Sequence, residues 1–394
     1  MFKSSALLAL LSASFGSAQF SNQTARPASC QQPSGDFNIT SFQLYPENLD
    51  FDSSRCRIYL GVLYDASVAV YDLAQKRVLD DIISIPNITN NPLLHASGIQ
   101  YDDRNDRLSV MLNSGAAFDT QGTNTAGDNN VMSYDLKNGS VNFVVNLSNY
   151  SDAEFRGFQD MEHDNEGNIF VVGTFGGSLM RISADGLNVT QWGRGPNSSD
   201  RGLSGAAKFN ETTLLITDNS DSQVYRYSMT ERNQRTKVEL SGADNISADL
   251  DGIYMPPMYR GAVLLVSALT DTVVLRSNDG NDGWATAERL GAIPNKFAGE
   301  QGLTTASVEA GGRILSIHEY FLDNGGTLPG NRSQFPVADI TESVEELLAG
   351  NSPGANGTSG SDSDVPGSSI GGSGRVMVSW GVLGAAAGLA MMLN

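Results

Sequence analysis

The amino-acid sequence predicts an all-β protein, a six-bladed β-propeller closed by an N-terminal strand. A unit made of an Asp-rich turn, an apolar strand, a short polar loop and a second apolar strand recurs about every 45 to 60 residues. Six such units can be counted, and no long amphipathic helix interrupts them. The last unit lacks an outermost strand, and a strand-like run that belongs to no unit precedes the first. Together these observations predict a closed ring of four-stranded blades.

The first unit shows the predicted blade most clearly. Residues 47–52 lead into a turn, and strand-length runs follow at 57–63, 67–73 and 77–83. Each run is rich in β-branched or aromatic residues, as strands usually are. In the later units, strand-like runs lie at 97–102, 107–112, 131–136, 141–147, 168–172, 178–182, 213–217, 223–227, 262–267, 272–276 and 313–318.

The ring is predicted to close through the N-terminal run 37–45. After residues 335–340 the last unit continues into 342–348, which has a helical or frayed pattern, so its fourth strand is missing. A strand supplied by the N-terminus would leave the ring without a free edge. Cys30 and Cys56 are the only cysteines, and a disulfide between them would pin this closure; two free buried thiols are the alternative.

The N-terminus has the pattern of a secretory signal. Residues 1–18 contain Lys3, a short apolar run and small residues ahead of Gln19, which predicts a signal peptide cleaved at that point. A short N-terminal segment, 19–36, then precedes the propeller. Sequons for N-glycosylation, which a secreted protein can use, are frequent. They begin at Asn22, Asn38, Asn87, Asn138, Asn146, Asn149, Asn188, Asn197, Asn210, Asn245, Asn331 and Asn356.

The C-terminal part predicts a membrane anchor. The propeller domain at 37–350 is followed by a Gly/Ser-rich linker at 351–375 and a hydrophobic tail at 376–394. This layout resembles a glycosylphosphatidylinositol (GPI) attachment signal, with a simple membrane tail or an unprocessed tail as alternatives. We therefore expect the protein in the secretory pathway, either extracellular or GPI-anchored at the cell surface.

The charge of the chain restricts its partners. The net charge is −19 and the pI is near 4.4. Nucleic acid and anionic lipid surfaces would repel such a chain, so we expect no nucleic-acid partner and membrane contact only through the tail. The charge says little else, and the small-molecule substrate that we expect rests on the loops and the funnel of the predicted propeller.

Two predicted loops, residues 113–130 and 319–334, are much longer than their counterparts in the other blades. They belong to blades two and six, which both flank blade one in a ring of six, so they should meet over one side of the funnel. Long loops in compact domains are usually binding elements or disordered, and we expect a lid over a pocket, with a passive insertion as the alternative. Tyr320 and Phe321 of the second loop suit an apolar ligand.

The residues that open the inner strands are expected to ring the central funnel. Several acids converging there would have raised pKa values or would share a cation. Asp251 and Glu300 are therefore candidate catalytic acids, although polar side chains also line funnels simply because these hold water. The predicted substrate-binding residues are Glu47, Phe158, Gln159, Tyr320 and Phe321.

The three histidines have different expected roles. His95 and His318 are placed where both could reach one quadrant of the funnel, as general acid or base. His163 lies beside a turn expected at the far face, where a structural role is favoured. The sequence contains no nucleophile elbow, zinc-ligand spacing, P-loop or dinucleotide fingerprint.

Three inner-strand motifs give the chain a resemblance to a known group. Residues Pro46 to Asp50, Ala248 to Gly252 and Gly299 to Leu303, together with the secretion signal, resemble fungal six-bladed propellers encoded in secondary-metabolite clusters, including the trichothecene-cluster propeller and hetero-Diels-Alderases. The resemblance spans Phe37 to Ile340. It implies a cofactor-free cyclase or isomerase that holds a terpenoid or polyketide intermediate in the funnel. Such a catalyst would act by orienting its substrate and by hydrogen bonds to a developing oxyanion.

Two other interpretations remain open. The chain is also similar to gluconolactonase and senescence-marker propellers, a resemblance that implies Ca²⁺ or another divalent cation and a lactonase activity. Glu47 and Asp251 match the acidic ligands of that family, but Gln159 and Ser204 stand where it has Asn. The third interpretation is a non-catalytic, GPI-anchored surface binding protein, because propellers host enzymes and binders alike.

Overall fold

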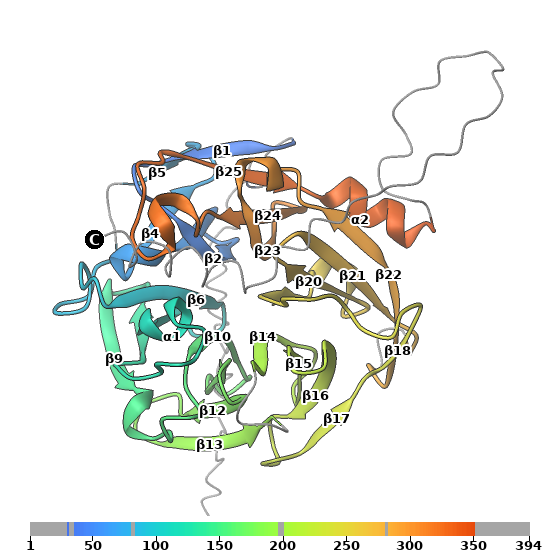
Figure 1. The fold of residues 1–394 in the computed structure, drawn as a ribbon, viewed down its shortest axis with the longest axis horizontal. Helices are drawn as coiled ribbons and strands as arrows, with labels where there is room; N and C mark the ends of the chain where they lie inside the picture. Colours follow the sequence, from blue (N-terminus) through green and yellow to red (C-terminus); the bar gives the residue numbers. More distant parts are fainter. Residues whose placement is uncertain (1–29, 31–34, 80–82, 196–200, 280–282, 351–394) are drawn as a thin grey trace, which may run out of the picture.

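A computed structural model of the protein describes residues 30, 35–79, 83–195, 201–279 and 283–350. Within them the chain forms six β-sheets arranged as blades around a central axis (Figure 1). The predicted signal peptide, linker and hydrophobic tail lie outside the described residues, as does most of the N-terminal segment. No helix in the described part of the chain is long and apolar enough to cross a membrane.

Each blade starts with an inner strand beside the axis and continues outward through antiparallel neighbours. Blade one contains β2 (Pro46–Asp52), β3 (Arg57–Val62), β4 (Ser67–Asp72) and β5 (Arg77–Val78). Blade two contains β6 (Leu94–Asp102), β7 (Arg107–Ser114), β8 (Asn130–Asp135) and β9 (Ser140–Asn146). Blade three contains β10 (Phe158–His163), β11 (Ile169–Gly173), β12 (Ser178–Ile182) and β13 (Val189–Arg194).

The remaining blades follow the same order, with one addition in blade five. Blade four contains β14 (Leu203–Lys208), β15 (Thr213–Asp218), β16 (Gln223–Ser228) and β17 (Arg235–Lys237). Blade five contains β19 (Ile253–Tyr254), β20 (Val263–Ala268), β21 (Asp271–Ser277) and β22 (Thr286–Pro294). A fifth strand, β18 (Glu239–Ser241), pairs in parallel with β22, which the sequence did not predict. Blade six contains β23 (Leu303–Ala310), β24 (Arg313–Glu319), β25 (Gln334–Asp339) and β1 (Phe37–Thr40).

The predicted closure of the ring is confirmed. β1 lies antiparallel to β25, with Phe37 opposite Val337, so the N-terminus supplies the outermost strand of the last blade (Figure 1). A disulfide joins Cys30 to Cys56. β1 is shorter than predicted because the backbone beyond it turns: φ is 56° at Gln43 and 39° at Tyr45, in the left-handed region that no strand uses.

Helices are short and connect or cover the blades. The predicted helical pattern at 342–348 is confirmed as α2 (Thr341–Leu348), which buries Val344 and Leu347 against blades five and six. The others in the described part of the chain are α1 (Ala116–Asp119) and the 3-10 turns η1 (Leu63–Asp65), η2 (Leu147–Asn149), η3 (Pro257–Tyr259), η5 (Ala298–Glu300) and η6 (Asp323–Gly326).

The core lies between neighbouring blades, because both faces of each blade are covered. Leu60 of blade one, for example, packs in one cluster with Leu315 and Ile317 of blade six. Near the axis the backbones of neighbouring blades lie too close together for a side chain at Gly98. A Cβ there would lie 2.5 Å from the carbonyl oxygen of Gln159 in the next blade.

Most predicted sequon asparagines in the described residues are exposed, and their occupancy stays a prediction. Asn146 is half-buried, and its Nδ2 donates to Asp128 Oδ1 at 2.7 Å. Asn22, Asn197 and Asn356 lie outside the described residues. The exposed ones are Asn38, Asn87, Asn138, Asn149, Asn188, Asn210, Asn245 and Asn331.

Candidate functional site

The inner strands are irregular where they open at the top of the funnel. A bulge adds a residue to one strand and re-aims its side chain. Through these irregularities Glu47, Ser97 and Gln159 reach the axial pocket. Register shifts separate Pro46 from Leu49, Ala96 from Ile99, Phe158 from Asp160, Leu203 from Ala206, and Thr304 from Ala306.

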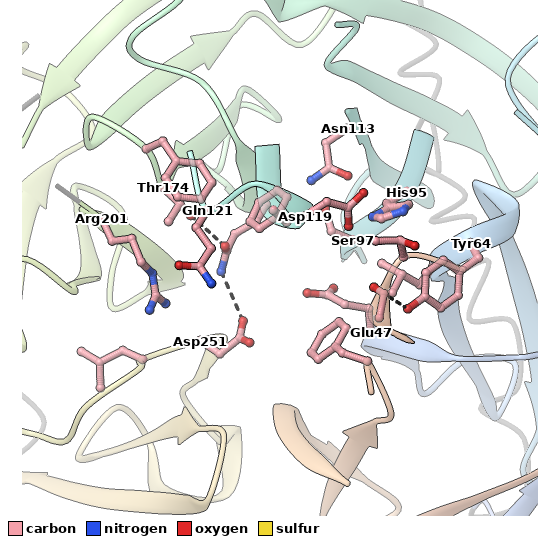
Figure 2. Close-up of a pocket in the computed structure, with 18 of the residues that line it drawn as sticks. Glu47, Tyr64, His95, Ser97, Asn113, Asp119, Gln121, Thr174, Arg201 and Asp251 are labelled. Carbon is pink, nitrogen blue, oxygen red and sulfur yellow. Dashed lines mark hydrogen bonds between the residues drawn. The ribbon is translucent and has the colours of Figure 1, made fainter. Parts of the chain in front are cut away.

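A pocket of about 100 Å³ occupies this end of the funnel. Figure 2 shows His95 and Ser97 beside Glu47 and Tyr64 on one side, with Asp251 and Arg201 across from them. Its apolar wall consists of Leu63, Phe118, Phe175, Leu250 and Phe321. Its polar lining consists of Glu47, Tyr64, His95, Ser97, Asn113, Asp119, Gln121, Gln159, Thr174, Arg201, Asp251 and Thr327.

Both long loops reach this pocket. The loop between β7 and β8 carries α1, and its Phe118 packs 5.5 Å from Phe175 of blade three, centroid to centroid. The loop between β24 and β25 carries η6 and brings Phe321 to the wall. The hydroxyl of Tyr64 donates to the Gly326 carbonyl oxygen at 3.4 Å, which ties this loop to blade one.

Two acids with raised pKa values, Glu47 and Asp251, face each other across the pocket. Burial raises the pKa of Glu47 well above its ordinary value, and the Asp251, Asp160 and Glu319 carboxyls add to the shift. Burial also raises the pKa of Asp251, to about 7, although Arg201 and a backbone N–H act in the opposite direction. At neutral pH Glu47 is therefore a carboxyl group that can donate a hydrogen bond, and Asp251 titrates close to this pH.

The orientation of Asp251 is set by a short relay. Thr174 Oγ1 donates to Gln159 Oε1 at 2.7 Å, which turns the amide so that Gln159 Nε2 donates to Asp251 Oδ1 at 3.2 Å. Arg201 Nη1 donates to Asp249 Oδ1 at 2.8 Å, so its positive charge is paired beside the pocket.

His95 is a neutral imidazole at the same site. It is 6 % exposed, and burial lowers its pKa to about 4. Its ring meets Tyr64 edge-on with the centroids 5.3 Å apart. Gly115 lies against the ring so closely that a Cβ there would be 2.6 Å from Nε2. The pocket thus places a protonated carboxyl and an unprotonated imidazole together.

Several buried polar atoms around the pocket lack a protein partner among the described residues. They include Glu47 Oε2, Ser97 Oγ and Asn113 Oδ1. The amide nitrogen of Asn113 is occupied, since it donates to the Phe158 carbonyl oxygen at 2.7 Å. Each such buried atom costs about 1–3 kcal/mol if nothing bonds to it, so these atoms are available to a polar group on a ligand.

Glu319 adds a further acid close to the pocket. It ends β24, is fully buried, and neither carboxyl oxygen has a hydrogen-bond partner in the described residues. Burial raises its pKa well above the ordinary range. β2 packs against β24, and Glu319, when it is ionised, raises the pKa of Glu47 and of Tyr64.

Of the residues predicted from the sequence, Glu47, His95, Gln159, Asp251 and Phe321 line the pocket. Phe158 does not, because the bulge directs its neighbour Gln159 to the axis and leaves Phe158 fully buried in the core between blades two and three. Glu300 does not either. It belongs to the exposed turn η5, which ends at Gln301 (φ 65°) before the inner strand begins.

His318 and Tyr320 also lie away from the pocket. Side chains alternate along β24, so Ile317 packs toward blade one while His318 turns to the other face. There its ring packs 5.0 Å from Phe297, centroid to centroid, and its Nδ1 is 3.3 Å from the Pro336 carbonyl oxygen. Tyr320 is fully buried beneath the loop, where the Arg332 guanidinium lies 3.5 Å from its ring centroid. The expectation that His318 shares the funnel with His95 is therefore wrong.

His163 lies at the opposite end of β10 from the pocket residue Gln159. It is buried, and its Nε2 is 2.9 Å from Ser109 Oγ.

The donor set does not fit a divalent cation. Within the described ranges, no group of three or more His, Cys, Asp or Glu side chains is arranged to hold a metal ion. Glu47 favours its protonated form, and one oxygen of Asp251 accepts from the Gln159 amide instead of facing a cation. A calcium site on Glu47 and Asp251 would require Glu47 to be ionised and would have only one oxygen of Asp251 that the Gln159 amide does not occupy.

Some lining residues were missed by the sequence analysis. Asn113, Phe118 and Asp119 belong to the long loop that the sequence did single out, but loop length cannot say which side chains turn inward. Phe175 and Arg201 come from a short loop and from the start of blade four, where no sequence signal marked them.

The ring of six blades and its axial pocket define the class of the protein, the six-bladed β-propellers. No protein-family model matches the chain. It is similar in sequence to "Trichothecene biosynthesis protein 14" of Trichoderma arundinaceum, with 28 % identity over 337 residues that cover 80 % of this chain and 91 % of that protein. It is also similar to "Core trichothecene cluster (CTC) protein 14" of Fusarium sporotrichioides, with 27 % identity over 333 residues, 80 % of this chain and 87 % of the other.

A solved structure supports the fold. The major allergen Mala s 1 of Malassezia sympodialis superposes with a TM-score of 0.67 at 19 % identity, covering 78 % of this chain and 96 % of that one. At this identity the likeness shows the fold alone. The predicted resemblance to trichothecene-cluster propellers is confirmed by the two sequence relatives.

Proposed function

We propose that the protein binds a small, neutral, apolar metabolite in the funnel pocket and catalyses its cyclisation or isomerisation without a cofactor. The observation that carries the proposal is that two buried groups, Glu47 with a raised pKa and His95 with a lowered pKa, line one aromatic-walled pocket. Two groups whose pKa values are pushed apart in this way are suited to serve as general acid and general base. The names of the two sequence relatives support a role in fungal secondary-metabolite biosynthesis.

Each side chain has a defined task in this mechanism. Glu47 donates a hydrogen bond, and where required its proton, to a carbonyl or leaving oxygen of the ligand. His95 accepts the proton of the attacking hydroxyl or carbon acid, so the reaction consumes no net proton once the two groups re-equilibrate. Phe118, Phe175 and Phe321 fix the apolar body, and holding two reacting parts in a near-attack geometry lowers the barrier by up to about 7–11 kcal/mol in favourable cases.

The proposed setting is the secretory pathway, with the protein extracellular or GPI-anchored. The signal-like N-terminus, the many exposed sequons and the hydrophobic tail support it. The pocket favours a neutral ligand, because an ionised Asp119 disfavours an anion and the charge of Arg201 is already paired with Asp249.

The test is a comparison of wild type with Glu47→Gln. Both proteins are incubated with fractionated terpenoid and polyketide extracts, and retained ligands and new isomers are measured by mass spectrometry. We expect the wild type to retain an apolar metabolite and convert it, and Glu47→Gln to lose about 10²- to 10⁴-fold in turnover, the usual contribution of a general acid.

The control is Glu211→Gln, which changes an exposed glutamate remote from the pocket and should leave turnover unchanged. Full turnover in Glu47→Gln would remove Glu47 from the mechanism. If the wild type retained no organic ligand from any extract but bound one equivalent of Ca²⁺, the metal-dependent lactonase interpretation would replace this one.

A further inference from the structure

The loop that carries Phe321 to the pocket is held by an ion pair within itself. Arg332 Nε donates to Asp323 Oδ2 at 2.8 Å and Arg332 Nη2 donates to Asp323 Oδ1 at 3.1 Å, a two-pronged contact. The same guanidinium stacks on the ring of Tyr320, 3.5 Å from its centroid. The pair therefore joins both ends of residues 320–333.

The segment that closes the propeller ring reaches into this contact. The hydroxyl of Tyr45 donates to Asp323 Oδ2 at 2.9 Å. Gln43 binds the other side of the loop, since its backbone N–H donates to the Arg332 carbonyl oxygen at 2.9 Å and its Nε2 donates to the Gly330 carbonyl oxygen at 2.8 Å. A Cβ on Gly330 would lie 2.7 Å from the Tyr45 hydroxyl, so only glycine permits this approach.

The backbone of the closing segment is strained in a way that this contact maintains. Gln43 and Tyr45 both have φ in the left-handed region, at 56° and 39°. Non-glycine residues persist there only when the surroundings over-determine them. Although burial acts against it, Arg332 and Tyr45 hold the pKa of Asp323 below its ordinary value, so Asp323 is ionised at neutral pH and its hydrogen bonds are charge-assisted.

We propose that Tyr45, Asp323 and Arg332 are positioning residues of the funnel pocket: they lock the loop at 320–333 onto the ring-closing segment and thereby set how tightly the pocket holds an apolar ligand. The loop contributes Phe321 and Thr327 to the lining, whereas none of the three locking residues lines the pocket. This inference rests on the pocket being the ligand site.

The test uses the full secreted protein carrying Asp323→Asn. Loss of the charge weakens the contacts to Arg332 and Tyr45, so amide hydrogen exchange in residues 320–333 should speed up. The dissociation constant for Nile red, a neutral apolar dye, should rise roughly tenfold, the change expected when one charge-assisted hydrogen bond to the loop is lost. Tyr45→Phe removes only one hydroxyl and should move both readouts in the same direction by less.

Asp339→Asn is the matched control, because it breaks another Arg–Asp pair of the same blade. Asp339 accepts from Arg313 Nε at 2.7 Å and lines no part of the pocket. We expect it to leave exchange at 320–333 and dye affinity unchanged. If Asp323→Asn had the same amide hydrogen exchange at 320–333 and the same dye affinity as the wild type, the proposal would be overturned. If the wild type bound no dye, the ligand-binding function would fail, while the exchange data would still decide whether the loop is locked.

Discussion

The two ends of the funnel both bury a histidine and a serine among carboxyl groups, but the serine is hydrogen-bonded by the described residues only at the far end. At the far end Ser109 Oγ lies 2.9 Å from His163 Nε2, and only the other ring nitrogen of His163 lacks a partner among the described residues. At the pocket end Ser97 Oγ has no such partner, although Ser97 is only 3 % exposed.

The same contrast holds for the acids. At the far end, Asp102 accepts a hydrogen bond from Arg107 Nε at 2.9 Å. The same guanidinium also donates to the carbonyl oxygen of Ala184 at 3.0 Å and to the carbonyl oxygen of Gly167. Glu47 at the pocket end keeps one buried oxygen unbonded by the described residues. Unmade buried hydrogen bonds cost stability, so the far end is built for stability while the pocket end retains groups that a ligand can use.

The largest effect that this comparison predicts is at Arg107. Arg107→Ala removes the ion-pair partner of the buried Asp102 carboxylate, to which only Asn105 of the described residues would still donate, and takes the Arg107 donor from two carbonyl oxygens. Removing one partner of a buried ion pair typically costs about 3–5 kcal/mol, and we expect that loss in the free energy of unfolding. Urea denaturation followed by circular dichroism measures it.

The control for Arg107→Ala is an exposed ion pair. Asp152 and Arg194 are 3.1 Å apart, with side chains 68 % and 43 % exposed. Asp152→Asn should change the free energy of unfolding by less than about 1 kcal/mol. Equal effects of the two variants would mean that the far end is not the stabilising region.

The second prediction concerns the dependence of stability on pH. The pKa of Asp251 is raised by folding from its ordinary value of 3.8 to about 7. The folded state therefore binds the extra proton, and the stability that this group contributes is fully present below pH 4 and lost as the pH rises through 7. Relative to wild type, the free energy of unfolding of Asp251→Asn should therefore rise between pH 4 and pH 7 by up to about 1.4 kcal/mol per pH unit. Urea midpoints measured from pH 4 to pH 8 test it.

At the far end, the pH dependence of stability that arises from Asp102 should have the opposite sign to that from Asp251. Although burial acts to raise the pKa of Asp102, His163, Asn105 and Arg107 hold it below its ordinary value. The stability that Asp102 contributes is therefore present above its ordinary pKa and is lost as the pH falls through the lowered pKa of the folded state. Asp102→Asn should be less stable than wild type near pH 7 and approach it in acid. Parallel curves for the two variants would contradict the comparison.

The fold was largely predictable because each blade repeats the same local pattern. Six units, the closing strand at the N-terminus and the disulfide all followed from repeats, from one missing strand and from two cysteines. The strand β18 did not follow, because Glu239, Leu240 and Ser241 carry no strand pattern and are ordered by pairing with β22. Tertiary contacts override local preference in such short segments.

The site was predictable only in part. The sequence placed Glu47, Gln159 and Asp251 at the openings of inner strands, where they do line the pocket. The predictions that Phe158 and His318 line the pocket were wrong for one reason: a bulge or a one-residue step turns a side chain to the opposite face of a strand. Periodicity locates the strand, whereas the bulge that decides which side chain faces the ligand depends on packing between blades.

The smallest effects come from the two serines, and they test the contrast most directly. Ser109→Ala leaves His163 Nε2 buried without its hydroxyl partner and should cost about 1–3 kcal/mol in the free energy of unfolding. Ser97→Ala removes a buried hydroxyl that bonds to no described residue, so we expect no loss in the free energy of unfolding and a gain of up to about 1–3 kcal/mol. Urea denaturation of the two variants side by side decides the matter. If Ser97→Ala cost as much as Ser109→Ala, the Ser97 hydroxyl would already be satisfied, and it would not be available to a ligand.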